Sequence, residues 1–314
     1  MSARAVPARR PLVATMITMD TALGSICALA AALLFGTGVV IQASAAPQMP
    51  RGDALRVALL GPMLRSVRWL WGAAIALVGW ALHAAALSLA PLTVVQPVLA
   101  LMLVVVLVLA RVTLHEQVGP REMIGSGALI VGIATIAATA PARSSQHASG
   151  WAIGTVLVVL AVLALAPLLW RRHLTARPAL VALCAGLAFS LSSVATKLFT
   201  DASPQTQPVQ VGLLLVMVGV AATVGGITQM SALQRRAATV VIPIAFATEV
   251  LVPVALAPVV FNERLASLGS ASSGVLLASI VLVILGVWLL ASSPVVGDMI
   301  AAGEHEAAVH APTS

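Results

Sequence analysis

Residues 237–261 read AATVVIPIAFATEVLVPVALAPVVF, an apolar run that contains a single charged residue, Glu249. Residues 92–111 read LTVVQPVLALMLVVVLVLAR and carry no charge before the final arginine. Each helical residue rises about 1.5 Å, so about 20 apolar residues cross the roughly 30 Å hydrocarbon core of a bilayer. Both stretches are therefore predicted to be transmembrane helices.

The composition of the whole chain indicates the same environment. Of its 314 residues, 60% are hydrophobic and 9% are charged, and the mean hydropathy is +1.06. A soluble domain carries about 25% charged residues, which cover its core with a polar surface. We therefore predict an all-α, polytopic transmembrane helical bundle whose main partners are membrane lipids.

Apolar runs separated by short loops rich in Arg, Pro, Gly and Ser predict about nine membrane spans. The predicted spans are residues 20–42, 69–90, 92–111, 121–140, 151–170, 178–199, 209–230, 237–261 and 271–291. The expected domains are a disordered tail (1–19), a first transmembrane repeat (20–140), a linker with the fifth helix (141–177), a second repeat (178–292) and a disordered cytoplasmic tail (293–314).

The distribution of charge predicts how the chain crosses the membrane. The net charge of +7 comes from arginines in the loops, which we interpret as a topology signal and not as a nucleic-acid surface. Loops on one side carry more than twice as many basic residues as loops on the other. The positive-inside rule then places the C-terminus in the cytoplasm and the N-terminus outside a cell membrane. Residues 51–68, with four arginines, are expected to form an amphipathic stretch on the inner surface.

The beginning of the chain allows two interpretations. A basic stretch, an apolar run and Ala43-Ser44-Ala45 resemble a cleaved signal peptide. The apolar run of about 22 residues exceeds the usual core of about 7–15, which favours an uncleaved first span. Met16 and Met19 are alternative start positions.

The chain also contains an internal repeat. TVVQP at 93–97 recurs as TVVIP at 239–243, and a glutamate follows each proline after 19 or 20 residues, Glu116 and Glu263 respectively. Five spans separate the start of one repeat from the start of the next, and an odd number reverses orientation. Two inverted four-helix repeats, with a site between them near the midplane, are typical of secondary transporters.

These motifs resemble a known superfamily. Pro97 with Glu116, and Pro243 with Glu263, each followed by a Gly-rich span, resemble the EamA-type drug/metabolite transporters. The nine-span plan and the run WALHAAALSLAPLTVVQP at 80–97 resemble the NIPA-type magnesium transporter branch. The resemblance implies secondary-active transport by alternating access, with these two prolines and two glutamates in structural roles.

The resemblance leaves three functions open. Trp80 and His83 stand where the NIPA-type branch usually carries an acidic residue and an asparagine. Because Mg²⁺ prefers oxygen ligands, we expect a small solute as the substrate and keep magnesium as the alternative. A membrane scaffold or lipid-intermediate binder without transport activity is the second alternative.

Polar side chains inside the spans are the candidates for the site. An ionisable group there costs about 2.5–3.5 kcal/mol on insertion scales, so it favours a functional role. The predicted substrate- or proton-binding residues are Glu249, His83, Gln229, Gln96 and Lys197, with Ser190, Ser192, Ser193 and Thr196 along a polar path. Each of the five also has a structural interpretation. Glu249 and His83 could serve helix packing, the two glutamines could form interhelical hydrogen bonds, and Lys197 could extend to the lipid headgroups.

Enzymatic chemistry is not indicated. The sequence lacks a nucleotide-binding loop with Lys-Ser/Thr, a GxSxG motif and a complete HExxH motif. We therefore expect no enzyme activity, no cofactor and no bound metal centre. The protein is expected to be a monomer or a homodimer.

Overall fold

The computed structural model describes residues 10–90, 92–139, 150–174, 177–200, 207–260 and 270–292, and within these ranges it contains helices and no strand. The longer helices are α1 (Arg10–Ala45), α3 (Val67–Leu89), α4 (Leu92–Ala100), α5 (Met102–Thr113), α6 (Pro120–Thr139), α7 (Gly150–Leu169), α9 (Pro178–Thr200), α10 (Pro208–Leu233), α11 (Ala238–Val260) and α12 (Ser270–Ala291). The short ones are α2 (Leu60–Arg65), α8 (Arg171–Leu174) and the 3₁₀ turns η1 (Ala46–Gln48), η2 (Arg51–Asp53) and η3 (Val57–Leu59).

The prediction of a polytopic helical membrane protein is confirmed. Within the described ranges, six helices contain stretches long and apolar enough to cross a bilayer, namely α1, α3, α7, α9, α10 and α12. Pro97–Thr113 and Ala238–Pro253 are shorter apolar helical stretches. Each predicted span overlaps a helix, but the total of nine spans stays a prediction.

Two helices differ from the predicted ranges. The predicted span 92–111 is divided at Leu101 into α4 and α5, one turn after Pro97. Leu101 donates its amide to the carbonyl of Val98 at 3.1 Å, a tighter turn than that of an α-helix. Helix α1 begins at Arg10, so it extends into the tail predicted to be disordered, where the sequence is still mostly apolar. Residues 1–9 and 293–314 lie outside the described ranges.

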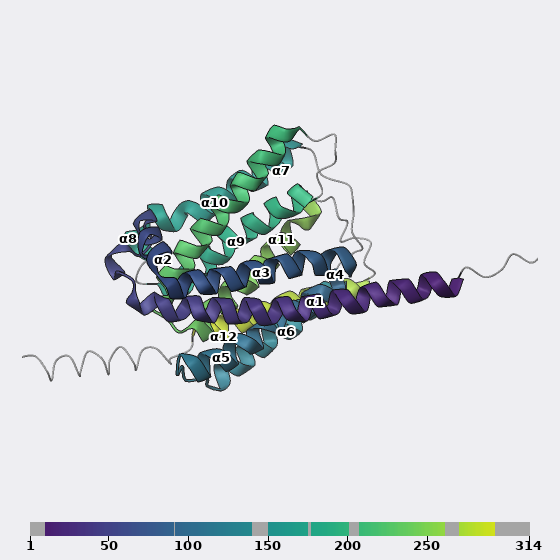
Figure 1. Ribbon diagram of the computed structural model, residues 1–314, viewed down its shortest axis with the longest axis horizontal. Helices are drawn as coiled ribbons and strands as arrows, with labels where there is room; N and C mark the ends of the chain where they lie inside the picture. Colours follow the sequence, from purple (N-terminus) through teal and green to yellow (C-terminus); the bar gives the residue numbers. More distant parts are fainter. Residues whose placement is uncertain are drawn as a thin grey trace, which may run out of the picture.

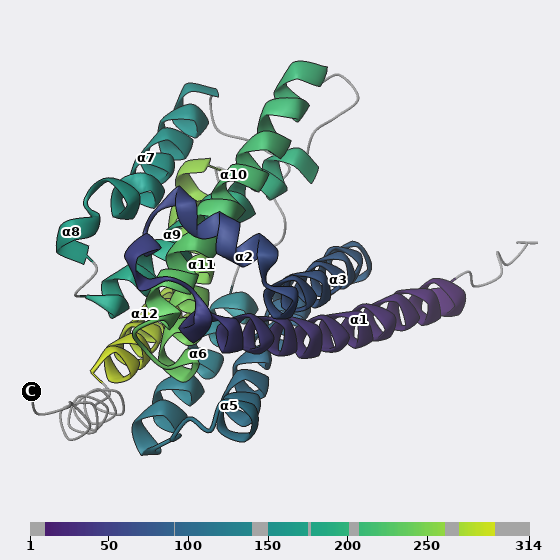
Figure 2. The same cartoon turned by 60° about the vertical axis from the view of Figure 1, so that its left-hand side comes forward.

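The helices pack in recurring pairs (Figure 1). Helix α1 lies along α3, and α9 lies along α10, with α7 against α9. Helix α6 packs on α12. The N-terminal end of α1 extends beyond the rest of the bundle in both views (Figure 1, Figure 2).

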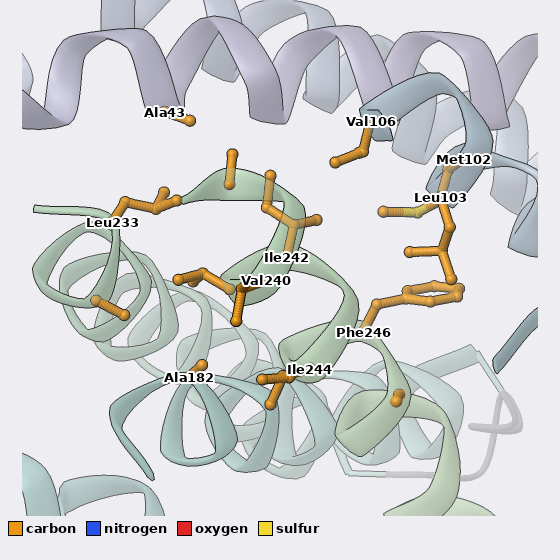
Figure 3. Close-up of a cluster of buried hydrophobic side chains, with 14 of the residues drawn as sticks. Ala43, Met102, Leu103, Val106, Ala182, Leu233, Val240, Ile242, Ile244 and Phe246 are labelled. Carbon is orange, nitrogen blue, oxygen red and sulfur yellow. The ribbon is translucent and has the colours of Figure 1, made fainter. Parts of the chain in front are cut away.

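Helix α11 supplies much of the buried core. Figure 3 shows Val240, Ile242, Ile244 and Phe246 of α11 among side chains from several neighbours. These neighbours are Ala43 of α1, Met102, Leu103 and Val106 of α5, Ala182 of α9 and Leu233 of α10. Helix α11 therefore joins elements from both ends of the chain.

The connection between α1 and α3, residues 46–66, packs on the protein. Its apolar side chains Leu55, Leu59 and Met63 are buried, whereas Arg56 is exposed. The amide of Leu55 donates to the Ser231 hydroxyl at 2.9 Å, and Leu55 itself has a φ of 56°. The amphipathic stretch expected from the sequence thus packs several of its apolar side chains against the bundle, whereas Val57 and Leu64 are exposed.

Glycines allow the closest helix crossings. A Cβ atom at Gly72 of α3 would lie 2.6 Å from the carbonyl oxygen of Gly38 in α1. A Cβ atom at Gly286 of α12 would lie 2.8 Å from the carbonyl oxygen of Gly125 in α6. Backbones this close gain dispersion contacts that larger residues would prevent, which is how helices associate in lipid.

The α1–α3 crossing generates a testable prediction. Gly72→Ala places a methyl group against the backbone of α1, so the helices must separate, at a cost of about 1–3 kcal/mol for overpacking. We expect the thermal midpoint of the purified protein in detergent to fall by several degrees. Gly219→Ala in α10, where nothing lies within 4 Å of the added atom, is the matched control and should melt like the wild type. Equal midpoints for both variants would contradict this account of the crossing.

Candidate functional site

Glu249 lies on α11 and faces α9. The hydroxyl of Ser193 donates to its Oε1 at 3.1 Å. Among the described side chains, no arginine forms an ion pair with this carboxylate; the side chain of Lys197 lies outside that set. The sequence identified Glu249 as an unusual charge in a span, and the structure gives it a hydroxyl partner.

Two other serines of α9 join it to neighbouring helices. Ser190 donates to the carbonyl of Thr248 on α11 at 3.1 Å and to that of Gly186 at 2.8 Å. Ser192 donates to the carbonyl of Val218 on α10 at 3.3 Å. A Cβ atom at Gly186 would lie 2.5 Å from the carbonyl oxygen of Ala245, so α9 and α11 cross with their backbones nearly touching. The crossing brings Ser193 within reach of Glu249.

Prolines alter the hydrogen bonding of α11. Pro253 has no amide hydrogen, so it cannot donate to the carbonyl of Glu249 four residues earlier. Pro243 is buried and likewise cannot donate to the carbonyl of Thr239, four residues before it. The residue that carries the carboxylate therefore also has a main-chain oxygen without its normal helical donor.

His83 occupies a different environment, on α3 beside α1. Its ring meets Phe35 edge to face, with centroids 6.4 Å apart and an interplanar angle of 65°. The Nδ1 atom is buried and has no hydrogen-bond partner in the described part of the chain. Nothing in the sequence marked Phe35 as its neighbour, because that contact depends on how α1 and α3 pack.

The remaining candidates lie on α10, α4 and α9. Gln229 is buried in α10, 9% exposed. Gln96 lies on α4 and Lys197 on α9, but their side chains fall outside the described set. No hydrogen bond or ring contact joins His83 to Gln229 or Glu249 among the described residues, so their grouping in one site stays a prediction.

Glu116 binds the beginning of α11. Its Oε1 accepts the amide of Ala238 at 2.6 Å and its Oε2 accepts the amide of Thr239 at 3.0 Å. Just before it, His115 has a φ of 56°, and the amide of Glu116 donates back to the carbonyl of Ala110 at 3.2 Å. The first amides of a helix lack intrahelical partners and carry partial positive charge, so a carboxylate there is stabilising.

The other residues of the repeated motif are two prolines and Glu263. Pro97 lies inside α4 and Pro243 inside α11. Glu263, the repeat counterpart of Glu116, lies outside the described residues. The contact of Glu116 with α11 links a loop of the predicted first repeat to a helix of the second.

Comparison with known protein families gives a match over most of the chain. A family model described as "Magnesium transporter NIPA" matches residues 19–294. No curated protein and no solved structure is found to match the chain.

The contact between Glu116 and α11 can be tested by stability. Glu116→Ala removes both acceptors, and hydrogen bonds to a charged group contribute about 1.5–3 kcal/mol. We expect a clear fall in the thermal midpoint for Glu116→Ala and a smaller fall for Glu116→Gln, which keeps one acceptor oxygen.

Asp20→Asn is the matched control, because Asp20 is an exposed acid on α1. Its midpoint should equal that of the wild type. A Glu116→Ala variant as stable as Asp20→Asn would show that the carboxylate contributes nothing at this helix end.

Proposed function

The chain belongs to the magnesium transporter NIPA family, and from this membership we propose that it moves Mg²⁺ across a membrane by secondary transport. The family match supports a membrane transporter, and it favours the magnesium alternative over the unspecified small solute expected from the sequence. The assignment of this function to a site rests on one observation. The carboxylate of Glu249 lies on an apolar helix next to a hydroxyl.

The oxygen atoms around Glu249 suit a hard cation. Its carboxylate, the Ser193 hydroxyl and the carbonyl left without a donor by Pro253 are all oxygen ligands. Mg²⁺ dehydrates reluctantly and is usually bound by one or two carboxylates while it keeps several waters. One glutamate with neutral oxygens beside it is thus sufficient for a partly hydrated ion that must also leave.

Electrostatics supports the same assignment. An ionised carboxylate in a low-dielectric bundle needs a compensating charge, because transfer from water is otherwise costly. None of the described arginines supplies that charge to Glu249. A transported cation, or a proton between transport steps, would supply it.

Alternating access requires two halves that can move against each other. The α1–α3 pair and the α9–α10 pair occupy corresponding positions in the two predicted repeats, and α6 packs on α12, its own counterpart. These pairings support the proposal of two inverted four-helix repeats. Nine spans and a cytoplasmic C-terminus are proposed from the hydropathy and charge of the sequence alone. The proposed site lies between α9 and α11 of the second predicted repeat, and an earlier part of α11 packs on α5 of the first (Figure 3).

The second candidate is a proton-coupled carrier of a small solute. The described residues contain no group of three or more His, Cys, Asp or Glu side chains that could hold a metal ion. A lone carboxylate is also sufficient for proton exchange, and Glu249 would then bind protons while another polar group binds the solute.

Flux through proteoliposomes tests the proposal. Wild-type protein should raise the signal of a magnesium-sensitive dye trapped inside, above that of protein-free vesicles. Glu249→Gln, which keeps size but loses charge, should reduce magnesium entry to the background rate, and Ser193→Ala should reduce it partly.

Ser192→Ala is the matched control, because Ser192 bonds to α10 and not to Glu249. It should transport magnesium at the wild-type rate, and all variants should match the wild type in thermal midpoint. Background magnesium flux in wild-type vesicles, with proton movement reported by a pH dye, would favour the second candidate. Normal flux in Glu249→Gln would remove Glu249 from either mechanism.

A further inference from the structure

A groove of about 700 Å³ opens on the surface where α1 ends and α3 begins. Its apolar wall includes Ile41 and Ala45 of α1, and Trp71 of α3. Its polar wall includes Arg65 and Arg68, at either side of the Ser66 that precedes α3. The groove therefore combines two cations with an apolar surface, which is the complement of an anionic amphiphile.

The two arginines are available to a ligand. Arg65 and Arg68 are exposed, and within the described ranges neither forms an ion pair or a hydrogen bond with the protein. The Ser66 hydroxyl caps α3 by accepting the amide of Trp69 at 3.2 Å. The amide of Val67, in the first turn, has no intrahelical acceptor, so it adds partial positive charge on the same side.

The position of the groove sets the depth at which it meets the membrane. One candidate span, Met19–Gln48, ends at the groove and another, Val67–Ala86, begins there. When these two stretches cross the bilayer, the groove at their common end comes to the level of the lipid headgroups, whichever way the protein is inserted. Val67 and Trp71 are 67% and 66% exposed, and they extend the apolar surface from the arginines toward the hydrocarbon. A headgroup in the groove would leave its acyl chains beside these side chains.

We propose that this groove is a binding site for the headgroup of an anionic phospholipid. The phosphate would bind the guanidinium groups of Arg65 and Arg68, which match its oxygens in geometry as well as charge. Exposed Gln48 offers an amide to a polar headgroup substituent. Basic sites between transmembrane helices at the membrane surface recognise anionic lipids in this way.

The site is separate from the proposed transport site. The groove is formed by the α1–α3 pair, whereas Glu249 lies between α9 and α11, and no residue is common to both. Lipid binding is therefore independent of which ion or solute the protein carries.

Native mass spectrometry of the full chain tests the proposal. Protein in detergent micelles is mixed with equal amounts of phosphatidylglycerol and phosphatidylcholine that carry the same acyl chains. We expect the wild type to retain phosphatidylglycerol preferentially. The Arg65→Gln/Arg68→Gln variant should bind it roughly thirtyfold more weakly, since each basic residue near a membrane surface contributes about 1 kcal/mol to anionic-lipid attraction.

The matched control is Arg51→Gln/Arg56→Gln, which removes two exposed arginines of the same connection that do not line the groove. It should bind phosphatidylglycerol like the wild type, and inorganic phosphate at millimolar concentration should not displace the lipid. Equal losses in the two double variants, equal retention of the two lipids, or displacement by phosphate would each overturn the proposal. Thermal midpoints of both variants in lipid-free detergent show whether they are folded.

Discussion

Close contact between helix backbones is the constraint on which the rest of this structure depends. In lipid an apolar side chain gains little by leaving its solvent, so helices must be held together by dispersion and by polar contacts. The crossings at Gly38 and Gly72, at Gly125 and Gly286, and at Gly186 provide such contact. The last of these also places α9 so close to α11 that a serine reaches the partly buried carboxylate of Glu249, so the packing requirement and the site have the same origin.

The sequence predicted the helices well because their main signal is local. A run of about 20 apolar residues is sufficient to predict a span, whatever packs beside it. The connection between α1 and α3 was harder, because Leu55 depends on a hydroxyl 176 residues away at Ser231. The division between α4 and α5 was also missed. Pro97 lies inside α4, and the helix is interrupted only four residues later, at Leu101.

The site was predictable only in its most unusual member. Glu249 stands out because a carboxylate in an apolar run is expensive, and that argument needs no structure. Its pairing with Ser193 depends on the angle at which α9 crosses α11, which no spacing in the sequence encodes. For His83, its titratable ring and its position in a span suggested a member of the same site, and the contact of its ring with Phe35 of α1 could not be foreseen from the sequence.

Helix α11 is fixed at one end and weakened toward the other. Glu116 holds its first two amides. Pro243 removes one main-chain hydrogen bond from the first half of the helix, and Pro253 and Pro258 remove two from the second half. A helix held at one end in this way moves least at the held end and most at its far end. Glu249, near the middle, would therefore shift by only part of the distance travelled by the tip. A modest bend could thus exchange the oxygens beside the carboxylate while the buried first turns of α11 keep their place in the core.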